Sequence, residues 1–255
     1  MLLIIDLGNT NLTLGLYEGA TLLRHWRLAT DHERMPDEYG LQLQGLLDHA
    51  RCNPATLDGI VFSSVVPQLT GRVVQACRQY LDEEPLVVTS ALKNGLTIRY
   101  EPPTSVGTDR IADAVALKAL YGVPGIVIDF GTATSFNAVS REGEYLGGAI
   151  MAGVNVALTA LTQRAAKLAP VELTAPPSPI GRNTVHALQS GLLNGYAAMA
   201  EGMVSRFRSE IGADAKVVAT GGLAETIAPL TKVFDAVAPW LTLDGLRLIW
   251  EMNRP

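Results

Sequence analysis

Short apolar runs alternate with amphipathic stretches along the chain, a pattern typical of proteins that combine strands with helices. Leu2 to Ile5 is continuously apolar and leads into Asp6-Leu7-Gly8-Asn9-Thr10-Asn11, after which Leu12 to Tyr17 alternates between apolar and polar positions. This order predicts a buried strand, a turn that carries an acidic residue, and a returning strand that completes a hairpin.

A second copy of this arrangement lies further along the chain, at a spacing of about half its length. Gly125 to Ile128 leads into Asp129-Phe130-Gly131-Thr132-Ala133-Thr134, and Ser135 to Val139 alternates again. Self-similarity at so long a period indicates duplication of one α/β domain and not a solenoid of short repeats.

The remaining periodic segments favour parallel or mixed sheets covered by helices. Glycine and proline interrupt the pattern from Tyr121 to Gly125, so we expect an N-terminal domain over residues 1–121 and a C-terminal domain over 122–255. Pro170 to Pro179 is expected to be a connector, because proline is excluded from helix interiors. The expected strands are Ile60–Val66, Leu86–Val88 and Lys216–Ala219, and the expected helices are Leu69–Tyr80, Val154–Leu168 and Thr184–Ile211.

Charge and lysine content narrow the function classes. Among 255 residues, 20 Lys plus Arg stand against 25 Asp plus Glu, giving a net charge of −5, which argues against non-specific binding of nucleic acid. Only five residues are lysines, and none follows a glycine in the Gly-Lys-Ser/Thr order of a P-loop, so phosphate must be bound in another way. The N-terminal apolar run is too short for a signal peptide, and no stretch could span a bilayer, so we expect a cytoplasmic protein without a membrane partner.

Three glycine turns at strand ends are the first candidates for chemistry. A glycine two residues after an aspartate lets the backbone turn tightly, so that N–H groups point at an anion while the carboxylate reaches a hydrated metal. The turns at Asp6 and Asp129 share this spacing, and Thr220-Gly221-Gly222 ends a third strand. Three such turns converging on one cleft would bind a nucleoside triphosphate without a lysine.

The segment from Tyr100 to Arg110 holds the second group of candidates. Pro102 and Pro103 favour an extended chain, and Thr108 or Asp109 then caps a helix that begins near Arg110. The residues alone leave two interpretations open. In one, Asp109 only caps the helix beside a solvated Arg110; in the other, Asp109 accepts the proton of an attacking hydroxyl while Arg110 binds a substrate carboxylate.

Taken together, these motifs resemble those of the type III pantothenate kinase family. The resemblance runs from Leu3 to the Leu241-Thr242-Leu243-Asp244-Gly245-Leu246 tail, and Gly107-Thr108-Asp109-Arg110 is its most specific part. It implies an α/β fold of duplicated ribonuclease H-like (actin-like ATPase) domains, with mixed sheets flanked by helices and an interdomain nucleotide cleft. It also implies ATP-dependent phosphorylation of pantothenate to 4′-phosphopantothenate, the first step of coenzyme A biosynthesis.

The resemblance further implies a role for each candidate residue. Asp109 would accept the proton, Asp129 would bind a monovalent cation (potassium or ammonium), and Asp6 would hold magnesium through water. Thr184 would contact pantothenate from the partner subunit of a homodimer. The expected ATP-binding residues are Asp6, Leu7, Gly8, Asn9, Thr10, Asn11, Leu12, Thr13, Thr132, Gly221 and Gly222, and the expected pantothenate-binding residues are Tyr100, Gly107, Thr108, Asp109, Arg110 and Thr184.

One departure and two alternatives qualify this expectation. Ala152 stands where the family often has proline, which should relax a turn without removing a catalytic group. Another small-molecule kinase of the same superfamily would not need Tyr100 or the Asp109-Arg110 pair. A non-catalytic, nucleotide-dependent regulatory protein would have no reason to need Asp109.

Overall fold

The structure, a computed structural model, describes residues 1–254. The chain folds into two compact units. Unit 1 comprises Met1–Gly95, Glu101–Val115 and the chain from Thr242 onward, and unit 2 comprises Leu96–Tyr100 and Ala116–Leu241. The chain therefore passes from one unit to the other several times, whereas the division expected between residues 121 and 122 assumes a single crossing.

Unit 1 is built on a five-stranded mixed sheet. Its strands are β1 (Leu2–Leu7), β2 (Asn11–Glu18), β3 (Thr21–Ala29), β4 (Gly59–Ser64) and β5 (Leu86–Val87). They lie in the order β3-β2-β1-β4-β5. The central strand β1 pairs antiparallel with β2 and parallel with β4, and its apolar run is buried because helices cover both faces of the sheet.

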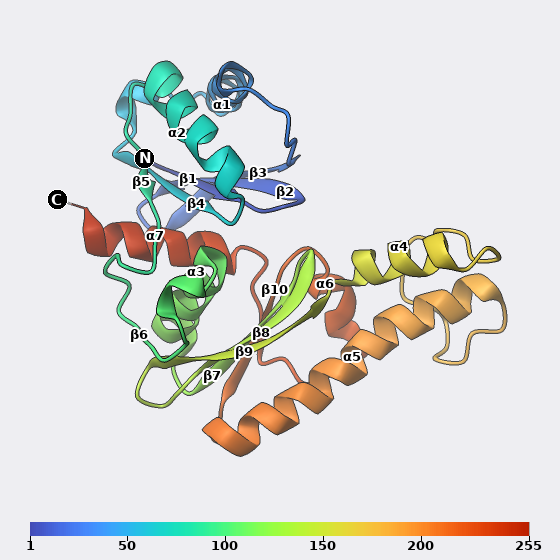
Figure 1. The fold of residues 1–255 in the computed structure, drawn as a ribbon. Helices are drawn as coiled ribbons and strands as arrows, with labels where there is room; N and C mark the ends of the chain where they lie inside the picture. Colours follow the sequence, from blue (N-terminus) through green and yellow to red (C-terminus); the bar gives the residue numbers. More distant parts are fainter. Residues whose placement is uncertain (255) are drawn as a thin grey trace. The chain divides into compact units, whose positions relative to one another are not determined.

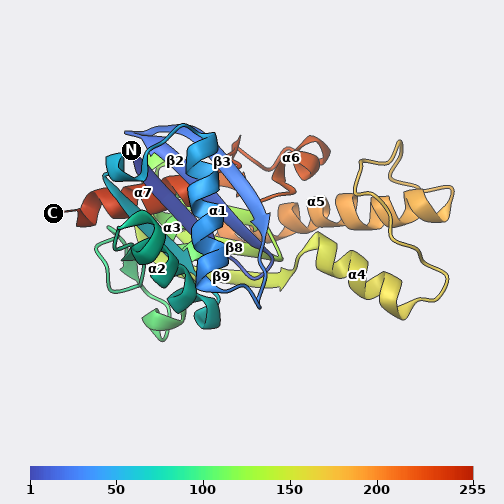
Figure 2. The ribbon, with the colours of Figure 1, turned by 90° about the horizontal axis from the view of Figure 1, so that it is seen from above.

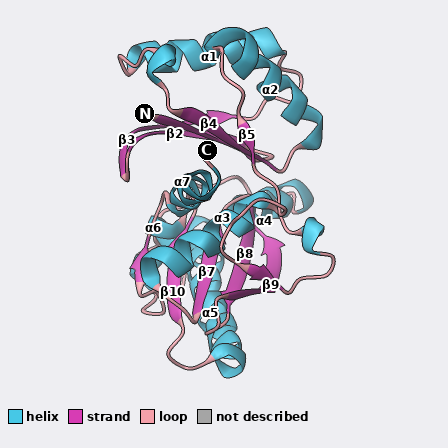
Figure 3. Cartoon of the chain, turned by 90° about the vertical axis from the view of Figure 1, so that its left-hand side faces the viewer, coloured by secondary structure: helices cyan, strands magenta, loops and turns pink. Residues whose placement is uncertain are grey.

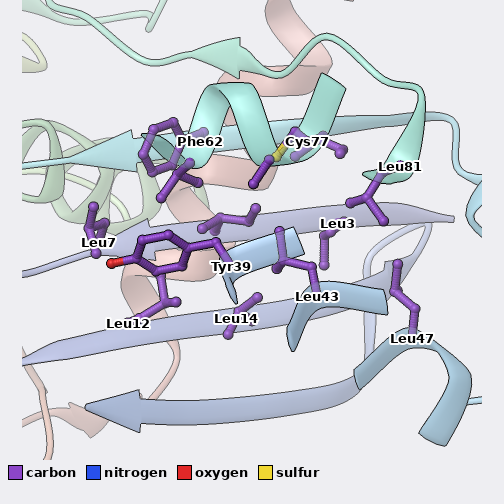
Figure 4. Close-up of a cluster of buried hydrophobic side chains, with 14 of the residues drawn as sticks. Leu3, Leu7, Leu12, Leu14, Tyr39, Leu43, Leu47, Phe62, Cys77 and Leu81 are labelled. Atoms are coloured by element: carbon purple, nitrogen blue, oxygen red, sulfur yellow. The ribbon is translucent and has the colours of Figure 1, made fainter. Parts of the chain in front are cut away.

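Helices from distant parts of the sequence cover the two faces of this sheet. On one face, α1 (Pro36–His49) and α2 (Pro67–Leu81) pack over an apolar core (Figures 1 and 4). On the other face lies α7 (Leu241–Asn253), next to α3 (Thr108–Ala116) (Figure 3). A Cβ on Gly15 of β2 would lie 3.0 Å from Leu243 of α7, so the C-terminal helix completes unit 1. Two short helical turns, η1 (Pro54–Thr56) and η2 (Pro103–Ser105), also belong to this unit.

Unit 2 contains a six-stranded sheet. Its strands are β6 (Thr97–Ile98), β7 (Gly125–Phe130), β8 (Ala133–Val139), β9 (Glu144–Ala152), β10 (Lys216–Thr220) and β11 (Ala236–Val237), in the order β11-β10-β7-β8-β9-β6. Residues 96–100 belong to this unit because β6 pairs with β9. The helical segments are η3 (Leu117–Tyr121), α4 (Val154–Arg164), α5 (Thr184–Ile211), α6 (Ala224–Ile227) and η4 (Ala228–Leu230).

The long helix α5 divides into two parts. Its buried residues, among them Leu193, Ala197 and Ala200, pack with Ile126 and Ile128 of β7. Its N-terminal part lies beside α4 and extends beyond the sheet of unit 2 (Figures 1 and 2). Asn183 begins the helix by accepting a hydrogen bond from the backbone N–H of His186 at 2.8 Å, which is the usual way an asparagine caps an N-terminus.

The two sheets confirm the duplication predicted from the sequence. The order β3-β2-β1-β4-β5 in unit 1 corresponds to β9-β8-β7-β10-β11 in unit 2. The directions also agree, since the first three strands of each set pair antiparallel and the last two join in parallel. Asp6 and Asp129 consequently hold equivalent positions, each one residue before the end of the central strand.

Most predicted elements are present with changed ends. Helix α5 has its predicted bounds, whereas α4 ends at Arg164, four residues earlier than expected, and β4 ends at Ser64, before Pro67 opens α2. Residues 170–179 form neither helix nor strand. Within residues 1–254, every helix is too short or too polar to cross a membrane.

Candidate functional site

The first candidate turn joins β1 to β2 in unit 1. It begins at Asp6, and the backbone N–H of Gly8 closes it by donating to the carbonyl of Asn11 at 2.9 Å. Thr30, just past β3, holds the turn from outside, because its hydroxyl donates to the carbonyl of Gly8 at 2.7 Å and its N–H donates to the carbonyl of Thr10 at 2.9 Å. The predicted ATP-binding residues of this unit therefore form one braced hairpin.

The predicted acceptor-site segment Gly107–Arg110 opens α3 beside the end of β4. The hydroxyl of Thr108, the first residue of α3, lies 2.9 Å from the hydroxyl of Ser63. Ser63 is in turn the in-register neighbour of Asp6 across the parallel β1–β4 pair. The structure thus brings Asp6 and the start of α3 to the same edge of the sheet, within one unit.

Asp109 is a half-buried carboxylate in the first turn of α3. Its Oδ1 accepts the backbone N–H of Arg110 at 2.8 Å. A side chain at position 107 would overlap this oxygen, and glycine avoids the overlap. Burial raises the pKa of Asp109, and the N–H and the charge of Arg110 oppose that rise. A carboxylate with a raised pKa is a stronger proton acceptor than an ordinary one.

Arg110 is not the solvated cation that one interpretation of the sequence required. Its exposed fraction is only 8%, so that interpretation is wrong on this point. The expected cap is wrong as well, because α3 begins at Thr108 and Gly107 precedes it, so that Thr108 and Asp109 lie inside the helix. The Oδ1 of Asp109 accepts the N–H of the next residue, Arg110, which is not a capping bond.

In unit 2, two glycine turns enclose the carboxylate of Asp129. A Cβ on Gly131 would lie 3.3 Å from Asp129 Oδ2. A Cβ on Gly221 would lie 2.7 Å from the backbone nitrogen of Phe130 and closer still to Asp129 Oδ1. Gly221 also has a φ of +89°, a conformation that favours glycine. Any side chain at position 221 would therefore overlap the carboxylate of Asp129.

Thr132 occupies the exposed tip of the turn between β7 and β8. The N–H of Gly131 donates to the carbonyl of Ala133 at 3.1 Å, and the N–H of Gly153 donates to the carbonyl of Thr132 at 3.0 Å. Ala152 ends β9, and its carbonyl accepts the hydroxyl of Tyr196 at 2.6 Å. This bond holds the strand end at which the family often has proline.

Tyr100 belongs to unit 2, whereas the Gly107–Arg110 segment belongs to unit 1. The ring of Tyr100 lies 6.5 Å from the ring of Tyr145, centroid to centroid. It also covers Gly147, where a Cβ would lie 3.0 Å from Tyr100 Cδ2 and where φ is +117°. Gly147 therefore leaves the space that the ring of Tyr100 fills.

Thr184 lies apart from the other predicted residues of unit 2. It is the first residue of α5 and is exposed, at the end of the helix that extends beyond the sheet (Figures 1 and 2). The turns around Asp129 lie instead at the end of the central strand. Within unit 2, Thr184 is therefore not part of the group formed by Asp129, Gly131 and Gly221.

Three residues that support these turns were not predicted from the sequence: Thr30, Ser63 and Gly153. Gly153 directly follows β9, and a Cβ there would lie 2.8 Å from the carbonyl carbon of Thr132. Thr30 and Ser63 carry no signal of their own in the sequence. Their contacts depend on pairing between segments that are far apart along the chain.

The carboxylate of Asp6 would fit a hydrated divalent metal, and the carboxylate of Asp129, which lies against Gly131 and Gly221, would fit a cation in direct contact. Within residues 1–254, no three His, Cys, Asp or Glu side chains gather as a metal-binding group. Magnesium in phosphoryl-transfer sites commonly has one or two carboxylates and takes its other ligands from water and phosphate. A lone carboxylate at the end of β1 is compatible with that kind of site.

Two units of equivalent strand order, each with an Asp-x-Gly turn at the end of its central strand, define a protein with the actin-like ATPase and sugar kinase fold. Component A of (R)-2-hydroxyglutaryl-CoA dehydratase from Acidaminococcus fermentans is 14% identical with a TM-score of 0.57, covering 99% of this chain and 98% of that chain. The inorganic polyphosphate/ATP-glucomannokinase of Arthrobacter sp. strain KM is 16% identical with a TM-score of 0.50, covering 98% and 97%. At these identities the likeness shows the fold alone.

Sequence comparison then identifies the family. The family model for type III pantothenate kinase matches residues 2–206. The type III pantothenate kinase of Roseiflexus sp. (strain RS-1) is 48% identical over 254 residues, covering 100% of both chains. The chain belongs to the type III pantothenate kinase family.

Proposed function

We propose that this protein transfers the γ-phosphoryl group of ATP to the primary hydroxyl of pantothenate, forming 4′-phosphopantothenate and ADP. Membership of the family over the full chain supports the reaction class. The observation that carries the proposal is the half-buried carboxylate of Asp109, with its raised pKa, at the same sheet edge as Asp6.

Asp109 accepts the proton of the attacking hydroxyl in this proposal. The hydroxyl oxygen forms a bond to the γ-phosphorus, the bond from that phosphorus to the β–γ bridging oxygen breaks, and the electron pair leaves with ADP. Such transfers pass through a loose transition state, so positioning and charge neutralisation contribute more than covalent chemistry. Arg110 binds the carboxylate of pantothenate through its planar guanidinium, and Tyr100 is a further proposed pantothenate contact.

The glycine turns hold the nucleotide. The hairpin from Asp6 to Thr13 in unit 1, and Thr132, Gly221 and Gly222 in unit 2, are the residues proposed to contact ATP. Asp6 would hold magnesium through water, and Asp129 would hold a monovalent cation such as potassium. When bound, these ions supply positive charge near the phosphates, which a chain with five lysines does not otherwise provide there.

A homodimer completes the acceptor site in this proposal. The start of α5 and the loop before it expose apolar side chains, among them Ile180 and Val185, with exposed fractions of 78% and 48%. Exposed apolar groups of this kind are typical of interaction surfaces. The second copy of the chain covers this surface, and Thr184 contacts pantothenate bound by the partner.

Mixing two inactive variants tests the shared site. A mixed dimer of D109N and T184A holds one site that combines an intact Asp109 with an intact Thr184 from the other subunit. We expect the mixture to regain activity after subunit exchange, with each variant alone remaining impaired. Mixed dimers, verified by affinity tags, that stay as inactive as the parents would contradict the shared site.

Coupled ADP release tests the reaction itself. We expect ADP formation to depend on pantothenate, to be absent with a panel of sugars, and to require both magnesium and potassium. Formation of ADP with a sugar but not with pantothenate would favour another small-molecule kinase. Nucleotide binding without turnover on any acceptor would favour a regulatory protein.

A further inference from the structure

Ser63, the last residue but one of β4, is a polar residue to which the proposed reaction assigns no role. Its exposed fraction is 0%, although it lies at the edge of the sheet where the candidate residues gather. A buried hydroxyl is costly unless it has a hydrogen-bond partner. The identity of that partner indicates what the residue does.

That partner is the first residue of the helix that carries Asp109. The hydroxyl oxygens of Ser63 and Thr108 lie 2.9 Å apart, and the hydroxyl of Thr108 is also 3.5 Å from the carbonyl of Ser64. Asp109 follows Thr108 directly in the first turn of α3. The contact between the two hydroxyls therefore fixes the backbone from which the carboxylate of Asp109 projects.

The other neighbour of Ser63 is Asp6. The two residues are in register across the parallel β1–β4 pair, and side chains at in-register positions point to the same face of a sheet. Ser63 consequently lies between the aspartate proposed to hold magnesium and the helix start proposed to hold the proton acceptor. A shift of Ser63 would therefore change the distance between Asp6 and the start of α3.

The duplication supports a functional position for Ser63. In unit 2, Thr220 pairs with Asp129 as Ser63 pairs with Asp6 in unit 1. Thr220 is also buried, and it leads directly into Gly221 and the turn around Asp129. The equivalent position thus lies beside the proposed ligand groups in both copies, at the carboxyl end of a parallel strand, where α/β proteins commonly bind ligands.

The next residue, Ser64, has a different task and provides a matched control. Its hydroxyl accepts the N–H of Val66 at 3.1 Å and the hydroxyl of Thr70 at 2.9 Å, and so supports the start of α2. Ser64 reaches α3 through its backbone carbonyl, which every substitution keeps. Two adjacent serines of β4 therefore support two different helices.

We propose that Ser63 is a positioning residue for phosphoryl transfer, which holds Asp109 in reach of the acceptor hydroxyl through Thr108. This inference rests on the proposed function. It predicts that loss of the Ser63 hydroxyl lowers kcat with pantothenate and leaves the KM for ATP unchanged. Since one hydrogen bond is lost, we expect kcat to fall by about 3- to 10-fold.

Variants at both ends of the bond test this role. S63A should lower kcat, and T108V should lower it at least as far, because Thr108 is also an expected pantothenate-binding residue. T108S, which keeps the hydroxyl, should be faster than T108V. The double variant S63A/T108V should be no slower than the slower single variant, because both remove the same bond. S64A should lower the melting temperature while kcat stays at the wild-type value. Multiplying losses in the double variant, or equal kinetic losses in S63A and S64A, would overturn the proposal.

A second cycle separates this inference from the proposed function. In a D109N background, S63A should cause no further loss of kcat, because Ser63 acts through the carboxylate that is missing. If D109N is slow and S63A slows it again by the full factor, only the role of Ser63 is overturned. If D109N retains wild-type turnover, the assignment of Asp109 is overturned and the role of Ser63 with it.

Discussion

Replacement of Gly221 with alanine tests how the carboxylate of Asp129 is held. A Cβ at this position would lie 2.7 Å from the backbone nitrogen of Phe130 and closer still to Asp129 Oδ1, whereas real Cβ atoms essentially never come within 3.0 Å. The nitrogen belongs to a strand in the middle of the sheet and cannot withdraw, so the carboxylate or the turn must move. A displacement of about 1 Å at a binding group can cost about 100-fold in rate. We expect kcat/KM for ATP in G221A to fall by about that factor.

The control for this variant is Gly122→Ala. Gly122 has the same φ of +89°, but a Cβ there would meet no atom within 4 Å. Both variants should lose about 1–3 kcal/mol of stability because a positive φ strains alanine, with a further loss in G221A from the overlap, and only G221A should lose activity. Steady-state ADP release at varied ATP, with thermal unfolding of each variant, separates the two effects. A folded G221A whose kcat/KM for ATP is less than about tenfold below wild type would refute the steric reasoning.

Asp109→Asn should lower turnover by about 10²- to 10⁴-fold, as is typical for loss of a general base, with little change in thermal unfolding. In the wild type, kcat/KM for pantothenate should fall as the pH drops through the pKa of Asp109, which burial holds above its ordinary 3.8; a pH profile without this acidic limb would contradict the assignment. Gly245→Ala should lower the melting temperature by the equivalent of about 1–3 kcal/mol, as overpacking does, because a Cβ there would lie 2.9 Å from Ala112 Cα and closer still to its carbonyl. Wild-type stability of that variant would show that α3 and α7 do not pack as described.

Local pattern was sufficient to predict the repeated strands and the long helix. An apolar run that ends in Asp-x-Gly and is followed by alternation is a local signal, and both copies became the expected hairpins. Helix α5 follows an asparagine cap and has a matching apolar face, which is again local. These signals need no knowledge of what each element packs against.

The division into units could not be predicted in the same way. Helix α7 belongs to unit 1 because Thr242 donates to Asp113 of α3 at 2.7 Å and Tyr17 of β2 donates to Asp244 at 2.9 Å. These pairs are separated by 129 and 227 residues. Glycine and proline near residue 122 mark a turn, but a turn does not indicate which partner the later chain will choose.

The candidate site shows the same limit. Aspartates in glycine turns are visible in the sequence because the residue types and spacing carry the signal. Thr30 and Ser63 are ordinary hydroxyl residues, and their importance lies in the partners they reach, the carbonyl of Gly8 and the hydroxyl of Thr108. Residues of this kind become visible only after strand order and register are known.

The duplication finally suggests why two equivalent aspartates would bind different ions. Asp129 is enclosed by Gly131 and Gly221, where backbone approaches the carboxylate closely. The strand neighbour of Asp6 is Ser63, and that of Asp129 is Thr220. The residue after Ser63 is Ser64, whose side chain supports α2, whereas the residue after Thr220 is Gly221. An enclosed carboxylate would suit direct contact with a weakly hydrated monovalent cation, whereas magnesium keeps several of its waters. The difference between Ser64 in unit 1 and Gly221 in unit 2 therefore fits the two proposed roles.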